Sequence, residues 1–255
     1  MLTRGQAREL SKKLKTNESV VYREFLQLYL LNGLYSLTGS ERVFFKGGTA
    51  LHLIYKTPRF SEDLDFTVGF SENKFKDLIR EVFLQSEKGI QISFKEKKTI
   101  TGKSYLATAE FPNLSYEVFV KLDFSFREVC KDPQKSIVET SFPILFKSYV
   151  YHLSEREIFA EKVRAILTRR KGRDIYDLWF LLNREVRFDD KLVKDKLSYY
   201  KIKGDYRGKL IEKVNSFSKE EFVLDLLPFV PIDARPELPK FLEFVKAYIS
   251  NKFKK

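Results

Sequence analysis

Two aspartates one residue apart, Asp63 and Asp65, are the residues in this sequence best suited to chemistry. Side chains alternate in direction along a β-strand, so Asp63, Asp65 and Thr67 share one face of the strand expected here. The other face is apolar and carries Leu64, Phe66 and Val68. The two carboxylates then lie about 7 Å apart along the strand. Because such close negative charges repel each other unless a cation lies between them, the pair predicts a site for Mg²⁺, or for Mn²⁺ in its place.

A glycine pair, Gly47-Gly48, precedes the aspartates by about fifteen residues, between an expected strand and a short helix. Glycine lets the backbone come close to a ligand, and the start of a helix favours an anion. Either feature alone is weak evidence, since most such pairs are simple turns. Together they predict a nucleoside triphosphate site. The phosphates would contact the turn from Lys46 to Thr49, and the metal ions would bind the carboxylates.

A third carboxylate, Asp123, lies on the strand expected from 116 to 126. One face of that strand is apolar, and the alternation places Asp123 on the opposite, polar face. Asp123 is therefore a candidate third metal ligand, which would hold the ion that activates an attacking hydroxyl. The alternative is an aspartate on an edge strand, facing solvent.

Charged residues on two expected helices form the last group of candidates. Ser154 followed by Glu157 is a capping box that starts a helix running to about residue 170. On this helix Lys162 is a candidate to stabilise the charge on a leaving pyrophosphate, and Arg164 is a candidate for nucleotide binding. The alternative is that both lie on a solvated helix face.

The next helix opens near Arg173 and carries Asp174 and Asp177, which are three residues apart and share a face. Arg173 and Asp177 are spaced to pair with each other. The alternative to a functional role is an ion-pair network that ties the two helices together.

The remaining pattern indicates the elements that position these residues. Strands are expected at 43–46, 90–94, 105–111 and 116–126, with a short one near 150–153. Helices are expected at 4–15, 18–37 and 72–86, and residues 128–150 are expected to be mostly irregular. Later helices are expected at about 154–170, from 173 on, and at 189–199, 205–216, 218–227 and 237–252. The change near residue 150 predicts an α+β fold, with a mixed core over 1–150 and a helical domain over 151–255 that contributes to the active site.

The composition indicates which partners and which cellular compartment fit this chemistry. A net charge of +12 on 255 residues favours an anionic partner such as nucleic acid, although a solvated lysine-rich surface is the alternative. One cysteine excludes an internal disulfide, and with two histidines it excludes an ordinary zinc site. No signal peptide is evident, and charged and polar residues interrupt the apolar run at 20–37, so a cytoplasmic protein without a membrane span is expected.

Three runs of sequence together resemble the AbiEii/AbiGii toxin family of nucleotidyltransferases. They are Phe-Lys-Gly-Gly-Thr-Ala-Leu-His-Leu-Ile-Tyr, Arg-Phe-Ser-Glu-Asp-Leu-Asp-Phe, and Glu-Ile-Phe-Ala-Glu-Lys-Val-Arg-Ala-Ile-Leu with Arg-Lys-Gly-Arg-Asp-Ile-Tyr-Asp-Leu. The resemblance covers roughly residues 20–185. It implies a DNA-polymerase-β-like nucleotidyltransferase core followed by a helical part.

The resemblance also implies roles for individual residues. Gly47, Gly48, Ser61, Asp63 and Asp65 match the first motif. Lys162 matches the lysine of the helical motif, and its later aspartate is matched by Asp177 or, alternatively, by Asp174. The assignment of Asp123 as a candidate metal ligand depends on its strand position alone, and not on a match to a sharp motif. The nucleotide-site hydroxyl is left open between Thr49 and Ser61.

The leading hypothesis is a metal-dependent nucleotidyltransferase that moves NMP from an NTP to an RNA, with the 3′ end of tRNA as the first candidate. The resemblance implies the toxin of a toxin–antitoxin or abortive-infection system, with an antitoxin as a possible partner, and a monomer is favoured. One alternative is a glycosyltransferase whose Asp-x-Asp holds a metal and a nucleotide sugar. Another is a non-catalytic module with the same fold that binds RNA or a partner protein.

Overall fold

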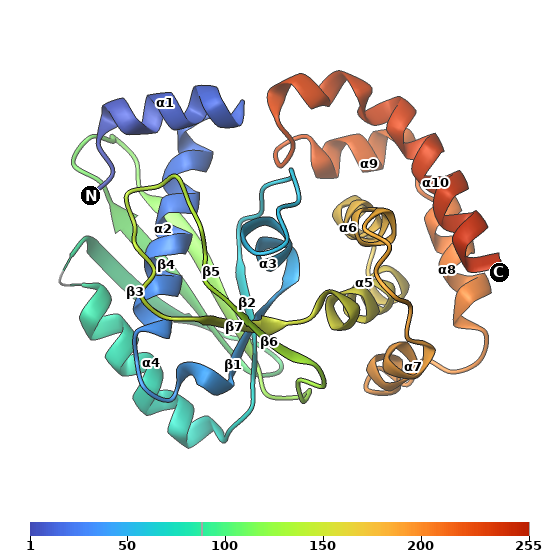
Figure 1. The fold of residues 1–255 in the computed structure, drawn as a ribbon, viewed down its shortest axis with the longest axis horizontal. Coiled ribbons are helices and arrows are strands. Elements are labelled where there is room, and N and C mark those ends of the chain that lie inside the picture. The colour runs from blue at the N-terminus through green and yellow to red at the C-terminus, as the bar shows by residue number, and fades with distance from the viewer. Residues whose placement is uncertain (88, 255) are drawn as a thin grey trace. The chain divides into compact units, whose positions relative to one another are not determined.

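The computed structural model describes residues 1–87 and 89–254, so Lys255, the end of the expected helical domain, lies outside the described residues. The chain forms two compact units (Figure 1). The first comprises Met1–Lys56 and Phe60–Leu153, and the second comprises Thr57–Arg59 and Ser154–Lys255. Two features differ from a simple division at residue 150. The strand at Val150–Leu153 belongs to the first unit, and three residues just before the aspartate pair belong to the second.

The first unit is built on a mixed sheet, which has seven strands within the described residues, in the order β3-β4-β5-β2-β1-β7-β6. The central strand β2 pairs antiparallel with β1 and parallel with β5. The strands are β1 (Val43–Lys46), β2 (Leu64–Val68), β3 (Gln91–Lys97), β4 (Lys103–Glu110), β5 (Val118–Ser125), β6 (Pro133–Ser136) and β7 (Val150–Leu153).

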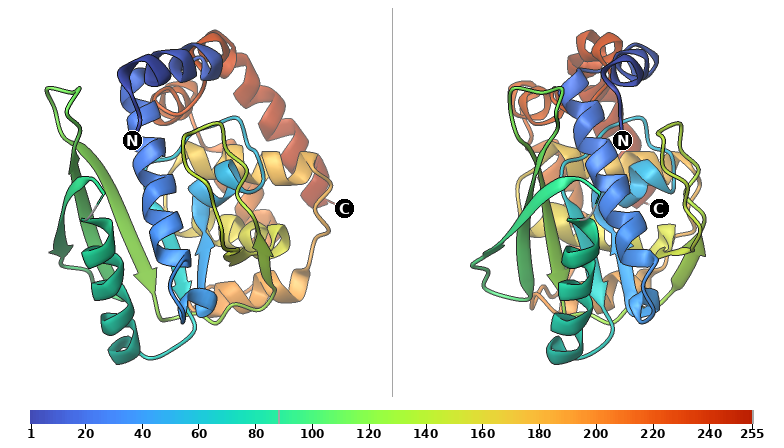
Figure 2. Two further views of the ribbon diagram at one scale, coloured as in Figure 1. Left: turned by 60° about the vertical axis from the view of Figure 1, so that its left-hand side comes forward. Right: turned by 90° about the vertical axis from the view of Figure 1, so that its left-hand side faces the viewer.

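Two helices of this unit cover the apolar face of the sheet. Helices α2 and α4 contact each other, and α2 also contacts β5 (Figure 2). The ring of Phe75 on α4 lies 4.6 Å from that of Phe124 on β5, and Phe124 stacks on Phe66 of β2 at 4.8 Å. The apolar side of β2 is thus buried, as the alternation predicts, and the polar side is turned away from these helices. The helical segments are α1 (Arg4–Leu14), α2 (Glu18–Tyr35), η1 (Ser40–Arg42), α3 (Gly47–Leu53) and α4 (Glu72–Ser86).

The segment 128–150 is mostly irregular, as expected, but Pro133–Ser136 within it forms the strand β6, which was not predicted. β6 is the last strand at one edge of the sheet and pairs only with β7 in the described register. A proline is acceptable as the first residue of an edge strand because it removes no ladder hydrogen bond that a neighbour needs. The hydroxyl of Ser136 lies 3.0 Å from Nε2 of His152 on β7, which adds a side-chain link to the pairing.

The second unit is helical beyond Ser154. Its first helix starts where the capping box predicts, since the amide of Glu157 donates to the Ser154 hydroxyl at 3.1 Å. An aromatic core joins α6 to α10, where the rings of Trp179 and Phe241 lie 4.6 Å apart. The segments are α5 (Glu155–Thr168), α6 (Gly172–Asn183), α7 (Asp190–Ser198), α8 (Tyr206–Asn215), α9 (Lys219–Leu226), η2 (Ile232–Glu237) and α10 (Leu238–Lys254). Among the described helices, none combines the length and the apolar character needed to cross a bilayer.

Candidate active site

The centre of the sheet brings Lys46, Asp65 and Asp123 into one row. Lys46 on β1 is the register partner of Asp65 on β2, and Asp65 is the register partner of Asp123 on β5. Partners on neighbouring strands point to the same face and lie about 5 Å apart. The parallel pairing of β2 with β5 therefore places two expected metal ligands side by side, although they are far apart in the sequence. Asp63 lies one residue before β2, in the loop that leads into it.

Gly47 packs directly against the carboxylate of Asp65. Its φ is +77°, in the region where residues with a side chain are strained. A Cβ atom at this position would lie 2.4 Å from Oδ2 of Asp65. The glycine expected to let a ligand approach the backbone is thus required by the close approach of Asp65. Gly48, the next residue, is buried in the first turn of α3.

Two side chains hold the loop that carries Ser61 and Asp63. Nε2 of Gln27 on α2 donates to the Ser61 carbonyl at 3.1 Å, and the hydroxyl of Thr49 on α3 donates to the Asp63 carbonyl. Thr49 is only 1% exposed. Its hydroxyl therefore serves to position the loop, whereas Ser61 is half-buried and reaches solvent.

The electrostatics of the loop are those of crowded carboxylates. Burial raises the pKa of Asp63 to about 6, and the negative charges of Asp65 and Glu62 add to this shift. Nζ of Lys121 lies 2.6 Å from Oδ2 of Asp123, so one positive charge already sits beside the cluster. A cation near these carboxylates would stabilise them, as expected from the close spacing of Asp63 and Asp65.

These residues suit a divalent ion that takes few protein ligands. Within residues 1–87 and 89–254, no three His, Cys, Asp or Glu side chains converge closely enough to hold one ion by themselves. The mutual repulsion at Asp63 and the ammonium beside Asp123 nevertheless show that this cluster accommodates positive charge. Mg²⁺ characteristically uses one or two carboxylates and completes its shell with water and phosphate oxygens.

The second unit holds a separate buried cluster around Asp177. Arg59 donates from Nε and Nη2 to the two carboxylate oxygens of Asp177, both at 2.6 Å, and Nζ of Lys162 lies 2.7 Å from Oδ2 of Asp177. Arg59 is 2% exposed and Asp177 is 0% exposed. Both oxygens of Asp177 are therefore engaged by cations, in the bidentate geometry that arginine favours.

Asp174 extends this cluster. Its carboxylate accepts from Lys162 at 2.9 Å and from Nε of Arg169 at 2.7 Å. Burial by itself would raise the pKa of Asp174, but Lys162 and Arg169 outweigh it and hold the pKa well below its ordinary value. The pKa of Asp177 is likewise lowered, since Arg59 and Lys162 overcome the effect of burial.

The structure shows whether the charged residues of α5 and α6 lie on a solvated face or in an ion-pair network. Lys162 is 6% exposed, so the alternative of a solvated face was wrong for this residue. An ion-pair network does tie α5 to α6, as the second alternative held. Arg164 has a different environment, because residues two apart point to opposite sides of a helix. Its Nη1 donates to the Tyr200 hydroxyl at 2.9 Å, and its guanidinium lies 4.6 Å from the centre of that ring.

Four residues at or beside these two clusters were not among the candidates from the sequence: Gln27, Arg59, Lys121 and Arg169. Arg59 stood in the run that carries the family resemblance, so a signal for it was present. Gln27 lies on a helix whose pattern indicates only burial. Lys121 lies two residues before Asp123 and so shares its polar strand face, but the contact between them depends on side-chain conformation.

The fold is similar to those of several solved structures, two of which are described as nucleotidyltransferases. MenT4, a nucleotidyltransferase toxin from Mycobacterium tuberculosis H37Rv, is 19% identical with a TM-score of 0.63 over 98% of this chain and 90% of that one. A putative nucleotidyltransferase from H. pylori is 24% identical with a TM-score of 0.59, over 93% of this chain and 97% of that one. JHP933 from Helicobacter pylori is 23% identical with a TM-score of 0.57, over 93% of this chain and 94% of that one. These likenesses confirm the expected fold class.

A mixed sheet followed by a helical region is the fold that this chain shares with these structures. Residues 29–249 match the family model described as nucleotidyl transferase AbiEii toxin, type IV TA system. The chain therefore belongs to the AbiEii family of nucleotidyltransferase toxins, which confirms the resemblance and the expectation of an enzyme of this class. This membership argues against the glycosyltransferase alternative. No curated protein matches the sequence.

Replacing Gly47 by alanine is expected to displace Asp65. The added Cβ overlaps Oδ2 of Asp65, and the left-handed backbone adds strain of about 1–3 kcal/mol. A displacement of about 1 Å at a reacting centre lowers activity roughly 100-fold. Nucleotidyl transfer and urea denaturation measure the two effects. Gly5→Ala is the matched control, because no atom lies within 4 Å of its added Cβ. Wild-type activity in Gly47→Ala would contradict the assigned packing.

Asp63→Asn is expected to stabilise the metal-free protein above pH 6. The unfolded carboxyl titrates near 3.8 and the folded one near 6, so the folded state binds more protons between these values and wild type loses stability as pH rises. The substitution removes a penalty of up to about 3 kcal/mol at pH 7.5, and the gain fades below about pH 4. Denaturant titrations across this pH range test it. Asp77→Asn on exposed α4 is the control, expected within about 0.5 kcal/mol of wild type. A variant less stable than wild type at pH 7.5 would refute the charge crowding.

Asp177→Asn is expected to destabilise the protein by about 3–5 kcal/mol, because it leaves the buried Arg59 without its bidentate counter-charge and removes one of the two carboxylates that pair with Lys162. Equilibrium unfolding measures this cost. Glu243→Gln removes an exposed carboxylate 4.0 Å from Lys219 and should change stability by less than about 1 kcal/mol. If Asp177→Asn kept wild-type stability and lost only activity, Asp177 would act in the chemistry and not in the framework.

Proposed function

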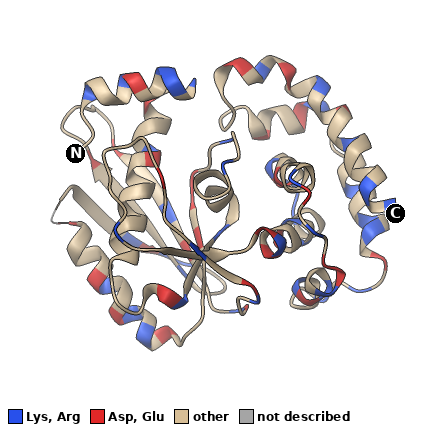
Figure 3. Ribbon diagram, in the orientation of Figure 1, with Lys and Arg blue, Asp and Glu red and all other residues tan. Residues whose placement is uncertain are grey.

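We propose that this protein transfers a nucleoside monophosphate from an NTP to the 3′ end of an RNA, with tRNA as the first candidate acceptor. The observation that carries the proposal is the row of Lys46, Asp65 and Asp123, with Gly47 packed on the Asp65 carboxylate. The net charge of +12 supports a polyanionic acceptor, and Lys and Arg residues occur in both units (Figure 3).

In this proposal the chain binds a triphosphate with the turn from Lys46 to Thr49 and with the hydroxyl of Ser61. Asp63, Asp65 and Asp123 would hold Mg²⁺ or Mn²⁺. When bound, such an ion supplies a Lewis acid for the phosphate oxygens. The raised pKa of Asp63 supports this assignment, since a site that must accept a cation is expected to be unfavourably negative without one.

The reaction requires that an acceptor hydroxyl oxygen attack the α-phosphorus while the bond to the bridging oxygen breaks and pyrophosphate leaves. Catalysis of this step consists mainly of positioning and charge stabilisation. Gly47 positions Asp65, and Gln27 and Thr49 position the loop of Asp63. The roles of Lys162 toward pyrophosphate, of Arg164 and Asp174 in nucleotide binding, and of Asp177 in catalysis stay predictions. A Lys162→Ala variant tests the first of them.

The type IV toxin family supports a biological role to accompany this chemistry. We propose that the protein acts in the cytoplasm as a monomeric toxin and is counteracted by an antitoxin. Growth of a host that expresses the protein, with and without the product of the neighbouring gene, tests this role.

The double variant Asp63→Asn/Asp65→Asn is expected to lose NMP transfer by about 1000-fold or more, because it removes two of the charges that hold the metal. The assay incubates protein with total RNA, Mg²⁺ and each labelled NTP in turn. Circular dichroism and the Asp77→Asn variant serve as controls for folding. Undiminished transfer in the double variant would contradict the metal-dependent mechanism. If wild type bound RNA and transferred nothing with any NTP, the non-catalytic alternative would stand.

A further inference from the structure

One face of β3, β4 and β5 continues outward from the carboxylate row. The register aligns three rows of side chains on this face, each running across β5, β4 and β3. Counting outward from the site, they are Asp123–Ser104–Lys97, Lys121–Leu106–Lys95 and Phe119–Thr108–Ser93. Asp123 is common to this face and to the candidate site, so the two form one continuous surface.

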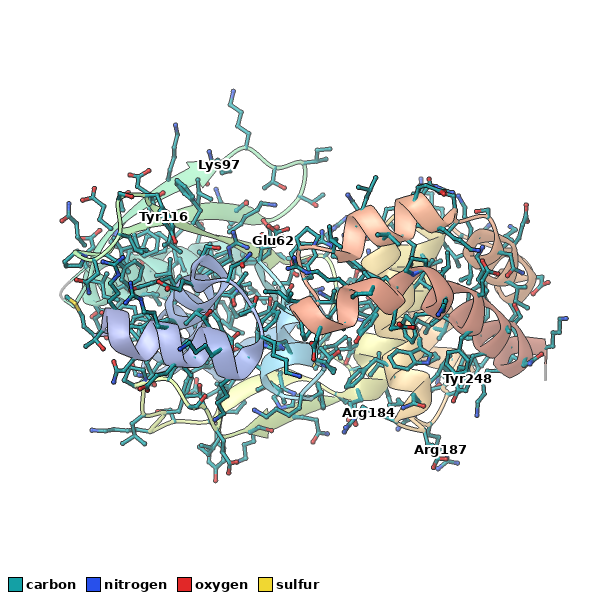
Figure 4. The ribbon with its side chains drawn as sticks, turned by 90° about the horizontal axis from the view of Figure 1, so that it is seen from above. Glu62, Lys97, Tyr116, Arg184, Arg187 and Tyr248 are labelled. Carbon is teal, nitrogen blue, oxygen red and sulfur yellow. The ribbon has the colours of Figure 1, made fainter. Side chains whose placement is uncertain are left out.

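This face is open, whereas its reverse is buried. On the reverse, Ile92, Ala107 and Val120 are 6%, 0% and 1% exposed. On the open face Lys95 and Lys121 are exposed, and Leu106 and Thr108 are half-buried, whereas Ser104, next to Asp123, is 3% exposed. Phe119 is 45% exposed, a large aromatic ring that nothing in the described chain stacks on. Lys97 at the end of β3 is labelled in Figure 4, with Tyr116 just before β5 and Glu62 in the loop beside Asp63.

The charge of the open face is mainly positive. Of its three lysines, Lys121 pairs with Asp123 at 2.6 Å. Within the described part of the chain, Lys95 and Lys97 have no carboxylate within ion-pair distance. Besides Asp123, the other carboxylate on this face is Glu110, at the far end of β4. Lys95 and Lys97 on β3 lie two strands from the uncovered Phe119 on β5, on the same face of the sheet, and none of the three has an evident structural task.

We propose that this face, the strand platform of Lys95, Lys97, Leu106, Phe119 and Lys121, binds the single-stranded 3′ end of the RNA acceptor. The lysines pair with backbone phosphates, and a base stacks on Phe119. Phe119 lies four positions before Asp123 on β5, which corresponds to about 13 Å along the strand. A strand that lies along β5 thus reaches the carboxylates with its last nucleotides. This inference rests on the proposed function for the identity of the acceptor.

Chemistry favours a nucleic acid over an acidic protein segment on this platform. Sheets with exposed aromatic rings bind single strands by stacking, and every base offers a face for it. An acidic peptide would use the lysines alone, with no need for the exposed ring of Phe119. A duplex would hide its bases from that ring. Because the platform continues to Asp123, an RNA bound along it would place its 3′ hydroxyl near the carboxylates of the candidate site.

The test compares binding of a fluorescein-labelled, unstructured 12-nucleotide RNA to the full chain by anisotropy, in EDTA and without NTP. Lys95→Ala/Lys97→Ala is expected to weaken binding about tenfold at 0.15 M salt and to lower the salt slope by about 1.4, the value for two phosphate contacts on a single strand. Phe119→Ala is expected to weaken binding between about fivefold and a hundredfold. Lys121 is left unchanged because it also contacts Asp123.

Lys74→Ala/Lys76→Ala is the matched control. It removes the same charge from exposed positions of α4, which packs on the reverse side of the sheet, and should bind RNA as wild type does. All substituted side chains are exposed or half-buried, and thermal unfolding checks that each variant folds.

The outcomes separate this inference from the proposed function. Equal binding by the platform and control variants, or no binding by wild type, overturns the platform. Selective loss of binding in the platform variants supports it, even if wild type transfers no nucleotide, in which case the proposed function alone fails. If the platform variants bind RNA normally but lose binding to an acidic peptide, the surface serves a protein partner and the inference is wrong.

Discussion

Repulsion among the carboxylates of Asp63, Asp65 and Asp123 is the constraint around which the first unit is arranged. The sheet places Asp65 and Asp123 in one row, and burial, together with the negative charges of its neighbours, raises the pKa of Asp63. Such an arrangement costs stability, and the framework must enforce it. Gly47 provides the space for the Asp65 carboxylate, and the hydroxyl of Thr49 fixes the Asp63 carbonyl. A stable protein with an unfavourable cluster of like charges is what a site for a cation requires.

The second unit solves a different electrostatic problem. Arg59, Lys162, Asp174 and Asp177 are all removed from water, which is costly for each charge taken singly. Opposite charges with matched geometry offset that cost, and the bidentate Arg59–Asp177 pair is the centre of the arrangement. Arg59 is only four residues from Asp63 in the chain, yet it packs in the second unit. The buried pair therefore anchors one end of the short segment that carries the aspartates.

Much of the fold follows from local patterns. The strand–turn–helix at 43–53, the helix at 72–86 and the capped helix after Ser154 appear where periodicity and capping predict them. The short edge strand at Pro133 was not predicted from the sequence, because its four residues have no apolar alternation and depend on β7 for their hydrogen bonds. Thr49 illustrates a similar limit within the site. Its residue type indicates a hydroxyl, but only the position of the neighbouring loop shows that the hydroxyl is used internally.

The sequence by itself determined the residue types and spacings of the two motifs, the alternation that separates the polar from the apolar face of β2 and β5, and the family. These properties are local, since they depend on strand and helix periods and on short runs of residues. Only the tertiary structure decided that Asp65 and Asp123 are neighbours, that Gly47 serves the Asp65 carboxylate, and that Arg59 neutralises Asp177. Each of these contacts joins residues distant in the chain, and long-range register and burial set them. The Asp63–Asp65 pair was visible from the start, whereas its environment emerged only when the sheet was assembled.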